Sequence, residues 1–258
     1  MKRTISAMSG PGVIAHNRRN YIAENVDRNR TSLNIEYCYT DIRQMYHQLF
    51  DSALAEFNAK QKRKDRMIEN YYEKICSGKQ EKPFYEVIFQ IGNKDDMSAA
   101  GENGELAKTV LDEFMRGFQQ RNPHLQVFSA HLHMDEATPH LHIDFIPFTT
   151  GSKRGLSTRV SLKQALADQG FAGEGKSNNE RNRWVEAEKR KLHQDSICIH
   201  FGSCFAVAYG ASDPQRIIRV IIHVYTSDYG IALRSTSGIF HYLLSKLGCM
   251  GFEFSAAL

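Results

Sequence analysis

The sequence lacks a cysteine framework and any long hydrophobic run. Its five cysteines are odd in number, and no two of them form a CxxC pair, so neither a disulfide network nor a cysteine-based zinc site is indicated. No stretch reaches about 18 consecutive apolar residues, and the basic start of the chain is not followed by an apolar core of signal-peptide length. We therefore expect a cytoplasmic protein without a membrane span.

Extreme charge is also absent. The formal net charge of the 258 residues is +4, and 41% of them are hydrophobic. A chain of this length and composition can bury a substantial core. A mild basic excess is compatible with nucleic-acid binding without requiring it, so composition alone leaves the function open.

Histidine, by contrast, is concentrated in one short segment. Five of the eleven histidines fall within it: His124, His131, His133, His140 and His142. Residues 125–133 and 139–147 alternate as two pleated strands do. Because only residues 134–138 connect them, we expect an antiparallel hairpin.

The predicted hairpin brings three imidazoles together. His133 ends the first strand, while His140 and His142 share one face of the second, so all three should meet beside the turn. Asp135 and Glu136 stand in the turn itself. Imidazoles with nearby carboxylates are typical ligands of divalent metals in sites of open coordination. We prefer a metal site to simple packing, because packing rarely uses three histidines at one point.

A polar, basic segment near the N-terminus is a second candidate site. Its arginines are Arg18, Arg19, Arg28 and Arg30, and its amides include Asn17, Asn20, Asn25 and Asn34. Arginine binds phosphate through a planar fork of donors, and amides donate to phosphates or base edges. We therefore interpret the segment as phosphate-contacting, with a solvated loop as the alternative.

The remaining pattern predicts an α+β architecture. Helical periodicity runs through 40–57, with Thr40 as the N-cap, and through 67–78 and 102–120. Residues 84–92 alternate as a strand does. Together with the hairpin, this order predicts an antiparallel sheet with helices packed on one face, which leaves the other face to the histidines.

The end of the chain differs from the rest. Residues 196–258 hold three of the five cysteines and few charges, and 217–225 has the pattern of a buried strand. We therefore expect a main domain over residues 1–195 and a C-terminal extension of uncertain fold and unknown role.

The histidine motif resembles that of a known family. Residues 133–142 are similar to the metal motif of the Pre/Mob plasmid recombination and mobilisation enzymes, the MobV class of relaxases, which nick one DNA strand at a transfer origin. Residues 15–19 resemble the nucleophile motif of that family, and 84–92 and 155–184 follow in matching order. The resemblance covers about residues 1–192 and implies a relaxase-like fold with a five-stranded antiparallel sheet.

The resemblance also implies an activity. The expected reaction is a site- and strand-specific nick by metal-assisted transesterification, which links the protein covalently to the 5′ phosphate. Mn²⁺ or Mg²⁺ would be held by the three histidines of the hairpin, with Glu136 in or near the shell. His16 is the implied nucleophile and Tyr21 the second choice, while Glu136 or Asp135 would orient the imidazole. Residues 1–195 would then form the relaxase domain.

The implied partner is plasmid origin DNA, either single-stranded or supercoiled. The basic N-terminal residues, with Lys153 and Arg154 in the loop after the hairpin, would contact its phosphates. A homodimer is left open. Two alternatives also stay open: a metal-dependent phosphodiester hydrolase without a covalent intermediate, and a non-enzymatic DNA-binding protein. Neither explains the cluster of histidine, asparagine and arginine around His16.

Overall fold

The computed structural model describes residues 4–209, with side chains described for residues 4–196. Residues Ile5–Leu192 form one compact unit, and the described residues outside it, Thr4 and 193–209, are not part of that unit. The predicted strand at 217–225 lies outside the described residues, and the domain boundary at 195 stays a prediction. Among the described helices, none is long and apolar enough to span a membrane.

The described elements alternate between strands and helices. In chain order they are β1 Ile5–Ser9, α1 Ile14–Asn17, a 3-10 helix at Arg28–Leu33, β2 Ile35–Tyr39, α2 Ile42–Ala59, a 3-10 helix at Lys64–Arg66, α3 Tyr71–Ser77, β3 Tyr85–Ile91, α4 Glu102–Arg116, α5 Phe118–Arg121, β4 Leu125–His133, β5 His140–Thr149, β6 Arg159–Val160, α6 Leu162–Asp168 and α7 Glu180–Tyr209.

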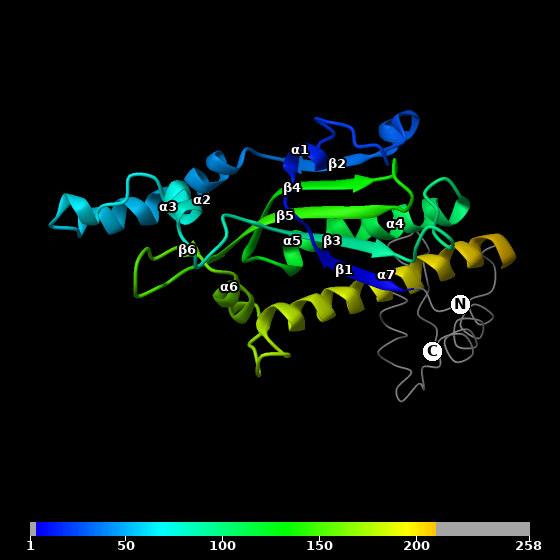
Figure 1. The fold of residues 1–258 in the computed structure, drawn as a ribbon. Coiled ribbons are helices and arrows are strands. Elements are labelled where there is room, and N and C mark those ends of the chain that lie inside the picture. The colour runs from blue at the N-terminus through cyan, green and yellow to red at the C-terminus, as the bar shows by residue number, and fades with distance from the viewer. Residues whose placement is uncertain (1–3, 210–258) are drawn as a thin grey trace. The chain divides into compact units, whose positions relative to one another are not determined.

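An antiparallel sheet forms the centre of the larger unit (Figure 1). Its strands lie in the order β1-β3-β5-β4-β2, and the short β6 pairs with the end of β5. The histidine hairpin is present as predicted, because β4 and β5 are joined by a short turn and pair His133 with His140 and His131 with His142. The antiparallel sheet expected from the sequence is thus confirmed.

One strand departs from strict alternation. β4 pairs Val127 with Phe145 and Ser129 with Asp144, so that a bulge lies between Val127 and Ser129. Directly paired residues share a face of the sheet, whereas neighbours along β5 point to opposite faces. Val127 and Leu125 therefore lie on the face opposite Ser129. Strict alternation along residues 125–133 predicts that both of them share the face of His131 and His133, and this prediction is wrong because a bulge interrupts the alternation.

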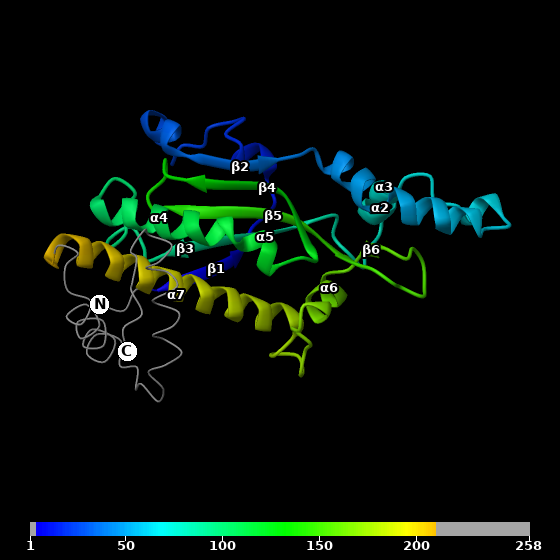
Figure 2. The same ribbon diagram turned by 180° about the vertical axis from the view of Figure 1, so that it is seen from behind.

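Helices cover one face of the sheet, as predicted. α4 and α5 lie against that face in both views (Figure 2). α4 buries an apolar stripe with spacings of three and four residues, formed by Ala107, Val110, Leu111 and Phe114. The first part of α7 is anchored by Trp184, whose ring contacts those of Phe118 and Phe145 and whose Nε1 donates to Asn122 Oδ1 at 2.7 Å.

α2 begins one residue later than expected. Its N-cap is Asp41, whose side chain accepts from the backbone N–H groups of Arg43 and Gln44. The predicted cap, Thr40, instead donates its N–H to the carbonyl of Phe128 at 2.7 Å. Thr40 therefore continues the pairing of β2 with β4, and the capping role passes to the next polar residue.

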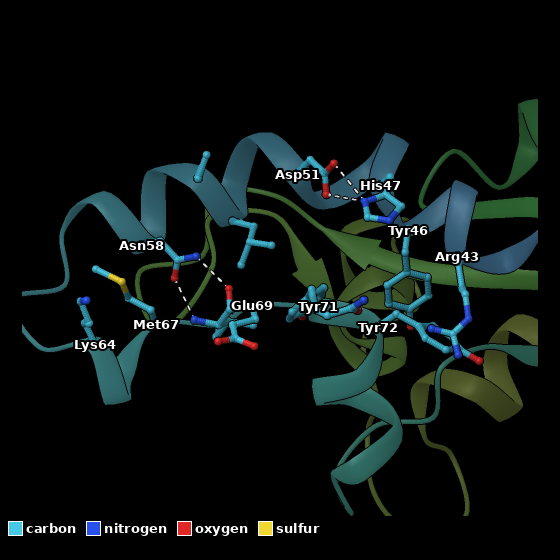
Figure 3. A pocket seen from close by; sticks show the side chains of 14 residues that line it. Arg43, Tyr46, His47, Asp51, Asn58, Lys64, Met67, Glu69, Tyr71 and Tyr72 are labelled. Carbon is cyan, nitrogen blue, oxygen red and sulfur yellow. Dashed lines mark hydrogen bonds and ion pairs between the residues drawn. The ribbon is translucent and has the colours of Figure 1, made fainter.

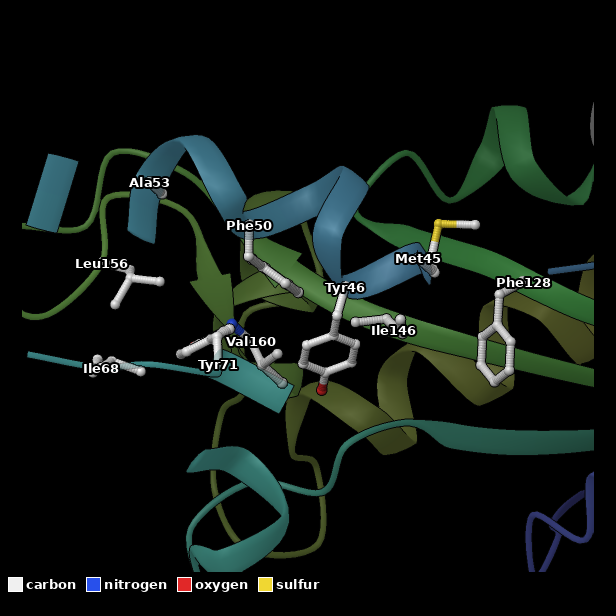
Figure 4. Close-up of a cluster of buried hydrophobic side chains, with 10 residues drawn as sticks. All are labelled: Met45, Tyr46, Phe50, Ala53, Ile68, Tyr71, Phe128, Ile146, Leu156 and Val160. Atoms are coloured by element: carbon white, nitrogen blue, oxygen red, sulfur yellow. The ribbon is translucent and has the colours of Figure 1, made fainter. Parts of the chain in front are cut away.

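α2 and α3 pack around a core cluster at the end of the sheet (Figure 4). Phe50 is fully buried, and its ring lies 5.1 Å from that of Tyr46 and 5.0 Å from that of Tyr71. Phe128 and Ile146 join the cluster from β4 and β5. These contacts dock the two helices onto the sheet.

A cleft of about 690 Å³ opens between α2 and residues 64–72 (Figure 3). Asn58 crosses it, since its amide donates to the carbonyl of Ile68 and accepts from the N–H of that residue. Arg43 stacks over the ring of Tyr72 at 4.6 Å. α2 and α3 lie at the opposite end of the sheet from the turn between β4 and β5 in both views (Figures 1 and 2).

The cluster makes a testable prediction about stability. Phe50→Ala should lower the free energy of unfolding by about 3–5 kcal/mol, because it leaves a cavity in a fully buried site. Phe57→Ala, the same change on the same helix at a partly buried position, should cost about 1–2 kcal/mol. Urea unfolding of the two variants measures the difference, and equal losses would contradict the packing described.

Candidate functional site

Three histidine rings meet beside the hairpin turn. The ring centroid of His133 lies 4.7 Å from that of His142 and 5.2 Å from that of His140, and the last two are 4.9 Å apart. The rings meet because His133 pairs directly with His140 across the hairpin. His142, two residues farther along β5, lies on the same face of the sheet as His140. The structure thus brings together the three predicted ligands, whose binding of a metal stays a prediction.

Each of the three rings is held by one of its nitrogens. The contacts are His133 Nε2 to Asn17 O at 2.8 Å, His140 Nδ1 to Thr138 O at 2.8 Å, and His142 Nδ1 to Glu86 Oε1 at 2.6 Å. Carbonyl and carboxylate oxygens only accept, so the held nitrogen donates in each case and the other nitrogen of a neutral ring carries a lone pair. Histidine ligands of metals are commonly anchored in this way.

The opposite nitrogens are the donor atoms that a metal could use. His133 Nδ1 and His142 Nε2 are buried without a hydrogen-bond partner in the described structure, and His140 Nε2 lies 3.8 Å from Glu136 Oε1. Donor atoms of His133, Glu136 and His140 lie within 4.8 Å of one another, and so do those of His16, His133 and His142. Because unpaired buried nitrogens are costly, this arrangement fits a divalent cation.

Burial keeps the imidazoles of His133 and His140 neutral. It lowers the pKa of His133 to about 2, and the charges of His142 and Arg19 lower it further. Burial likewise lowers the pKa of His140. A neutral imidazole has a lone pair for a metal, which a protonated one lacks. The electrostatics of the site therefore favour the metal-binding form.

His131 lies on the same face but farther from the turn. Its ring centroid is 6.3 Å from that of His133, and it belongs to neither group of donor atoms. Its Nε2 lies 3.2 Å from Ser129 Oγ, and burial lowers its pKa to about 4. His131 is thus a buried, hydrogen-bonded neighbour of the metal candidates.

α1 brings His16 to the same place. Its ring lies 5.9 Å from that of His133 and 6.2 Å from that of His142. Its Nε2 lies 3.2 Å from an Arg19 guanidinium nitrogen and 3.5 Å from Glu136 Oε1. Burial lowers the pKa of His16 and the charge of Arg19 adds to this, outweighing Glu136. The His16 side chain is therefore a neutral imidazole beside the histidine group.

Arg19 ties the N-terminal segment to the hairpin turn. It donates to both oxygens of Asp135, at 2.9 and 2.6 Å, and to Glu136 Oε1 at 2.8 Å. Asp135 also accepts from Thr31 Oγ1 at 3.1 Å and from Asn34 Nδ2 at 2.7 Å. Burial alone would raise the pKa of Asp135, but these donors lower it to about 2. The buried carboxylate of Asp135 thus holds residues 19, 31 and 34 of the N-terminal segment against the hairpin turn.

The predicted DNA-contacting residues fall into two groups. Five of them already form internal contacts: Asn17 with Glu86 and Asp144, Arg18 with Glu36, Arg19 with Asp135 and Glu136, Asn25 with Glu136, and Arg30 with the carbonyl of Met134. Arg18 stacks 3.6 Å above the ring of Tyr39, while Arg28, Lys153 and Arg154 are exposed. Contact with DNA stays a prediction for both groups.

Sequence reasoning missed Glu86, the second residue of β3, which has 1% of its side chain exposed. Burial would raise its pKa, but hydrogen bonds from His142, Gly12 and Asn17 lower it. Asp144, which pairs with Glu86 across β3 and β5, has its pKa shifted in the opposite direction. Burial and the charge of Glu86 raise the pKa of Asp144 to about 7. The signal that could have identified Glu86 is an acidic residue in a strand whose other residues, apart from Gln90, are aromatic or aliphatic.

Comparison with known proteins gives matches in one family. The family model described as plasmid recombination enzyme matches residues 14–195. A plasmid recombination enzyme of Streptococcus agalactiae is 29% identical over 101 residues, which are 35% of this chain and 20% of that protein. The match therefore spans about a fifth of the relative's length.

Similar solved structures include Mn-bound crystals of the MobM relaxase domain with plasmid oriT DNA. Those at pH 5.5 and pH 4.6 share 20% and 22% identity with the chain, and both comparisons cover 62% of it. They cover 75% and 76% of the respective MobM chains, with TM-scores of 0.37 and 0.35.

The buried pair of Arg19 and Asp135 predicts a pH dependence. Asp135→Asn should lower the free energy of unfolding near neutral pH by about 3 kcal/mol, because the guanidinium loses its charged partner. The pKa of Asp135 falls to about 2 on folding, so its stabilisation is present above about pH 4 and is lost as the pH falls toward 2.

Urea unfolding across this pH range measures both effects, and the variant should lack this part of the acid sensitivity. Asp65→Asn, which breaks an exposed ion pair with Arg63, should change the free energy by less than about 1 kcal/mol. Similar losses for the two variants would contradict a special role for the buried pair.

Proposed function

The chain belongs to the family of plasmid recombination enzymes, and from that premise we propose that it is a relaxase. In this proposal it nicks one strand at a plasmid origin by transesterification and becomes linked to the 5′ phosphate. The observation that carries the proposal is a neutral His16 beside Glu136 and the histidine group of the hairpin. The family match ends at residue 195, which supports a relaxase domain over 1–195 and a separate extension over 196–258.

We assign metal binding to His133, His140 and His142, with Glu136 beside them. Their anchored nitrogens and the unpaired nitrogens opposite support this assignment. Mn²⁺ is the first cation to test, because Mg²⁺ prefers oxygen ligands to imidazole. When bound, the cation would stabilise the negative charge that develops on the scissile phosphate.

His16 is the proposed nucleophile. Arg19 is a permanent donor, so its contact with Nε2 selects the tautomer in which that nitrogen carries the lone pair. Attack on phosphorus forms an N–P bond, breaks the P–O3′ bond, and leaves a 3′ hydroxyl once that oxygen has gained a proton. The ring becomes positively charged in this step, and Glu136, 3.5 Å away, stabilises it.

Tyr21 is the second candidate for the nucleophile. Its ring lies 5.9 Å from that of His16, and it is 50% exposed. His16 is preferred, because its surroundings lower its pKa and so favour the neutral form that has a lone pair for attack. The exposed cations Arg28, Lys153 and Arg154 are the residues that we propose for contact with DNA phosphates.

The metal assignment is tested by binding. After removal of metals with a chelator, calorimetry should show that the full-length chain binds Mn²⁺. His133→Ala, His140→Ala and His142→Ala should each weaken binding at least about tenfold. His131→Ala, a change on the same face outside the donor groups, should bind as the unaltered chain does. An equal loss for His131→Ala would contradict the assignment.

The nucleophile is tested with supercoiled plasmids that carry candidate origins, in the presence of Mn²⁺. Relaxed circles and protein-linked 5′ ends should form with the unaltered chain and with Tyr21→Phe, and the linked ends should disappear with His16→Ala. A covalent adduct that survives His16→Ala would overturn the choice of His16. Nicking without any adduct would favour a hydrolase, and DNA binding without nicking a non-enzymatic protein.

A further inference from the structure

We propose that Glu86 is a positioning residue shared by the two halves of the site, because its single carboxylate holds both a metal-ligand candidate and the segment that carries the nucleophile. Its Oε1 accepts from His142 Nδ1 at 2.6 Å and from Asn17 Nδ2 at 2.7 Å. Its Oε2 accepts from the backbone N–H of Gly12 at 2.8 Å. The inference rests on the proposed function, since it concerns the same metal and the same His16.

The contact with His142 fixes the orientation of that ring. Because Glu86 accepts at Nδ1, the neutral ring has its lone pair on Nε2, the nitrogen that is buried without a hydrogen-bond partner. Glu86 itself belongs to neither group of metal-donor atoms among the described residues. Its action on a metal would therefore pass through His142, as the carboxylate partners of histidine ligands commonly act.

The contact with Asn17 fixes the position of the nucleophile. Asn17 is the neighbour of His16 in α1 and is itself buried, with 2% of its surface exposed. Its side chain donates to Glu86, while its carbonyl lies 2.8 Å from His133 Nε2. α1 is thus held against two ligand candidates at once, so a shift of the Glu86 carboxylate would move His16 together with His142.

Residues 10–12, which precede α1, pass close to the Glu86 carboxylate. A Cβ at Gly10 would lie 1.6 Å from Glu86 Oε2, a distance that two atoms cannot occupy without displacement. Gly10 also donates its N–H to the backbone carbonyl of Glu86 at 3.3 Å, which continues the pairing of β1 with β3. The absence of a side chain at Gly10 therefore lets the backbone pass close enough for Gly12 to donate to the carboxylate.

Two substitutions test this shared role in the full-length chain. Glu86→Gln keeps the shape of the side chain but removes its charge and one acceptor oxygen. It should weaken Mn²⁺ binding by roughly 10- to 100-fold in calorimetry. At saturating Mn²⁺ it should still slow formation of the covalent DNA adduct by roughly 10- to 100-fold, because small displacements of a reacting group have effects of this size.

Gly10→Ala should act in the same direction without touching either the metal or DNA. Its Cβ would displace the Glu86 carboxylate, and we expect roughly a tenfold loss of Mn²⁺ affinity. Gly101→Ala is the matched control, because the nearest atom to its Cβ is 3.6 Å away and its φ is −106°. This control should bind Mn²⁺ as the unaltered chain does, and circular dichroism should show that all variants are folded.

The outcomes separate this inference from the proposed function. If the unaltered chain binds Mn²⁺ and Glu86→Gln binds it within about twofold, the inference is wrong and the proposed function stands. Weak Mn²⁺ binding with a normal adduct rate at saturation would overturn the shared role. Failure of the unaltered chain to bind Mn²⁺ or form an adduct would overturn both. If Glu86→Gln does not fold, Gly10→Ala, which keeps the carboxylate, decides the question.

Discussion

The register between β4 and β5 determines where each candidate ligand points. It pairs His131 with His142 on one face, and Leu132 with Leu141 on the other. Both leucines are fully buried under the helices, and burial of each such side chain is worth about 1.5–3 kcal/mol. A slip of one residue would exchange the faces, so the apolar face that fixes the register also fixes the histidine face.

Buried carboxylates connect the hairpin to the polar N-terminal segment. Asp135 is surrounded by donors from Arg19, Thr31 and Asn34, and Glu86 by donors from β5 and from residues 12 and 17. Burial of a carboxylate is unfavourable unless such donors replace water. The N-terminal segment must therefore dock for these charges to be buried, and this docking is what places His16 beside the hairpin.

Prediction from sequence succeeded where structure follows local periodicity. The hairpin, the stripe of α4 and the convergence of three histidines all depend on residues close together in the chain. The contact of Glu86 with His142 could not be predicted in this way, because the two residues lie 56 positions apart and on neighbouring strands. The bulge before Ser129 and the cap at Asp41 depend on how β4 meets its neighbours. The family resemblance is confirmed, while the roles of the site residues stay predictions.

At Arg19 the backbone has a conformation that favours glycine, while the side chain makes contacts within the candidate site. α1 ends in a Schellman motif, in which Asn20 N–H donates to Ala15 O and Arg19 N–H to His16 O. The C′ position is usually glycine, yet here Arg19 has a φ of 56°, at a cost of about 1–3 kcal/mol. Glycine would relieve this strain but would remove the guanidinium from His16 and Asp135 at once. Since the ion pair with Asp135 is buried, its contacts offset the strain locally, and the unfavourable backbone occurs at a residue whose side chain joins α1 to the hairpin turn.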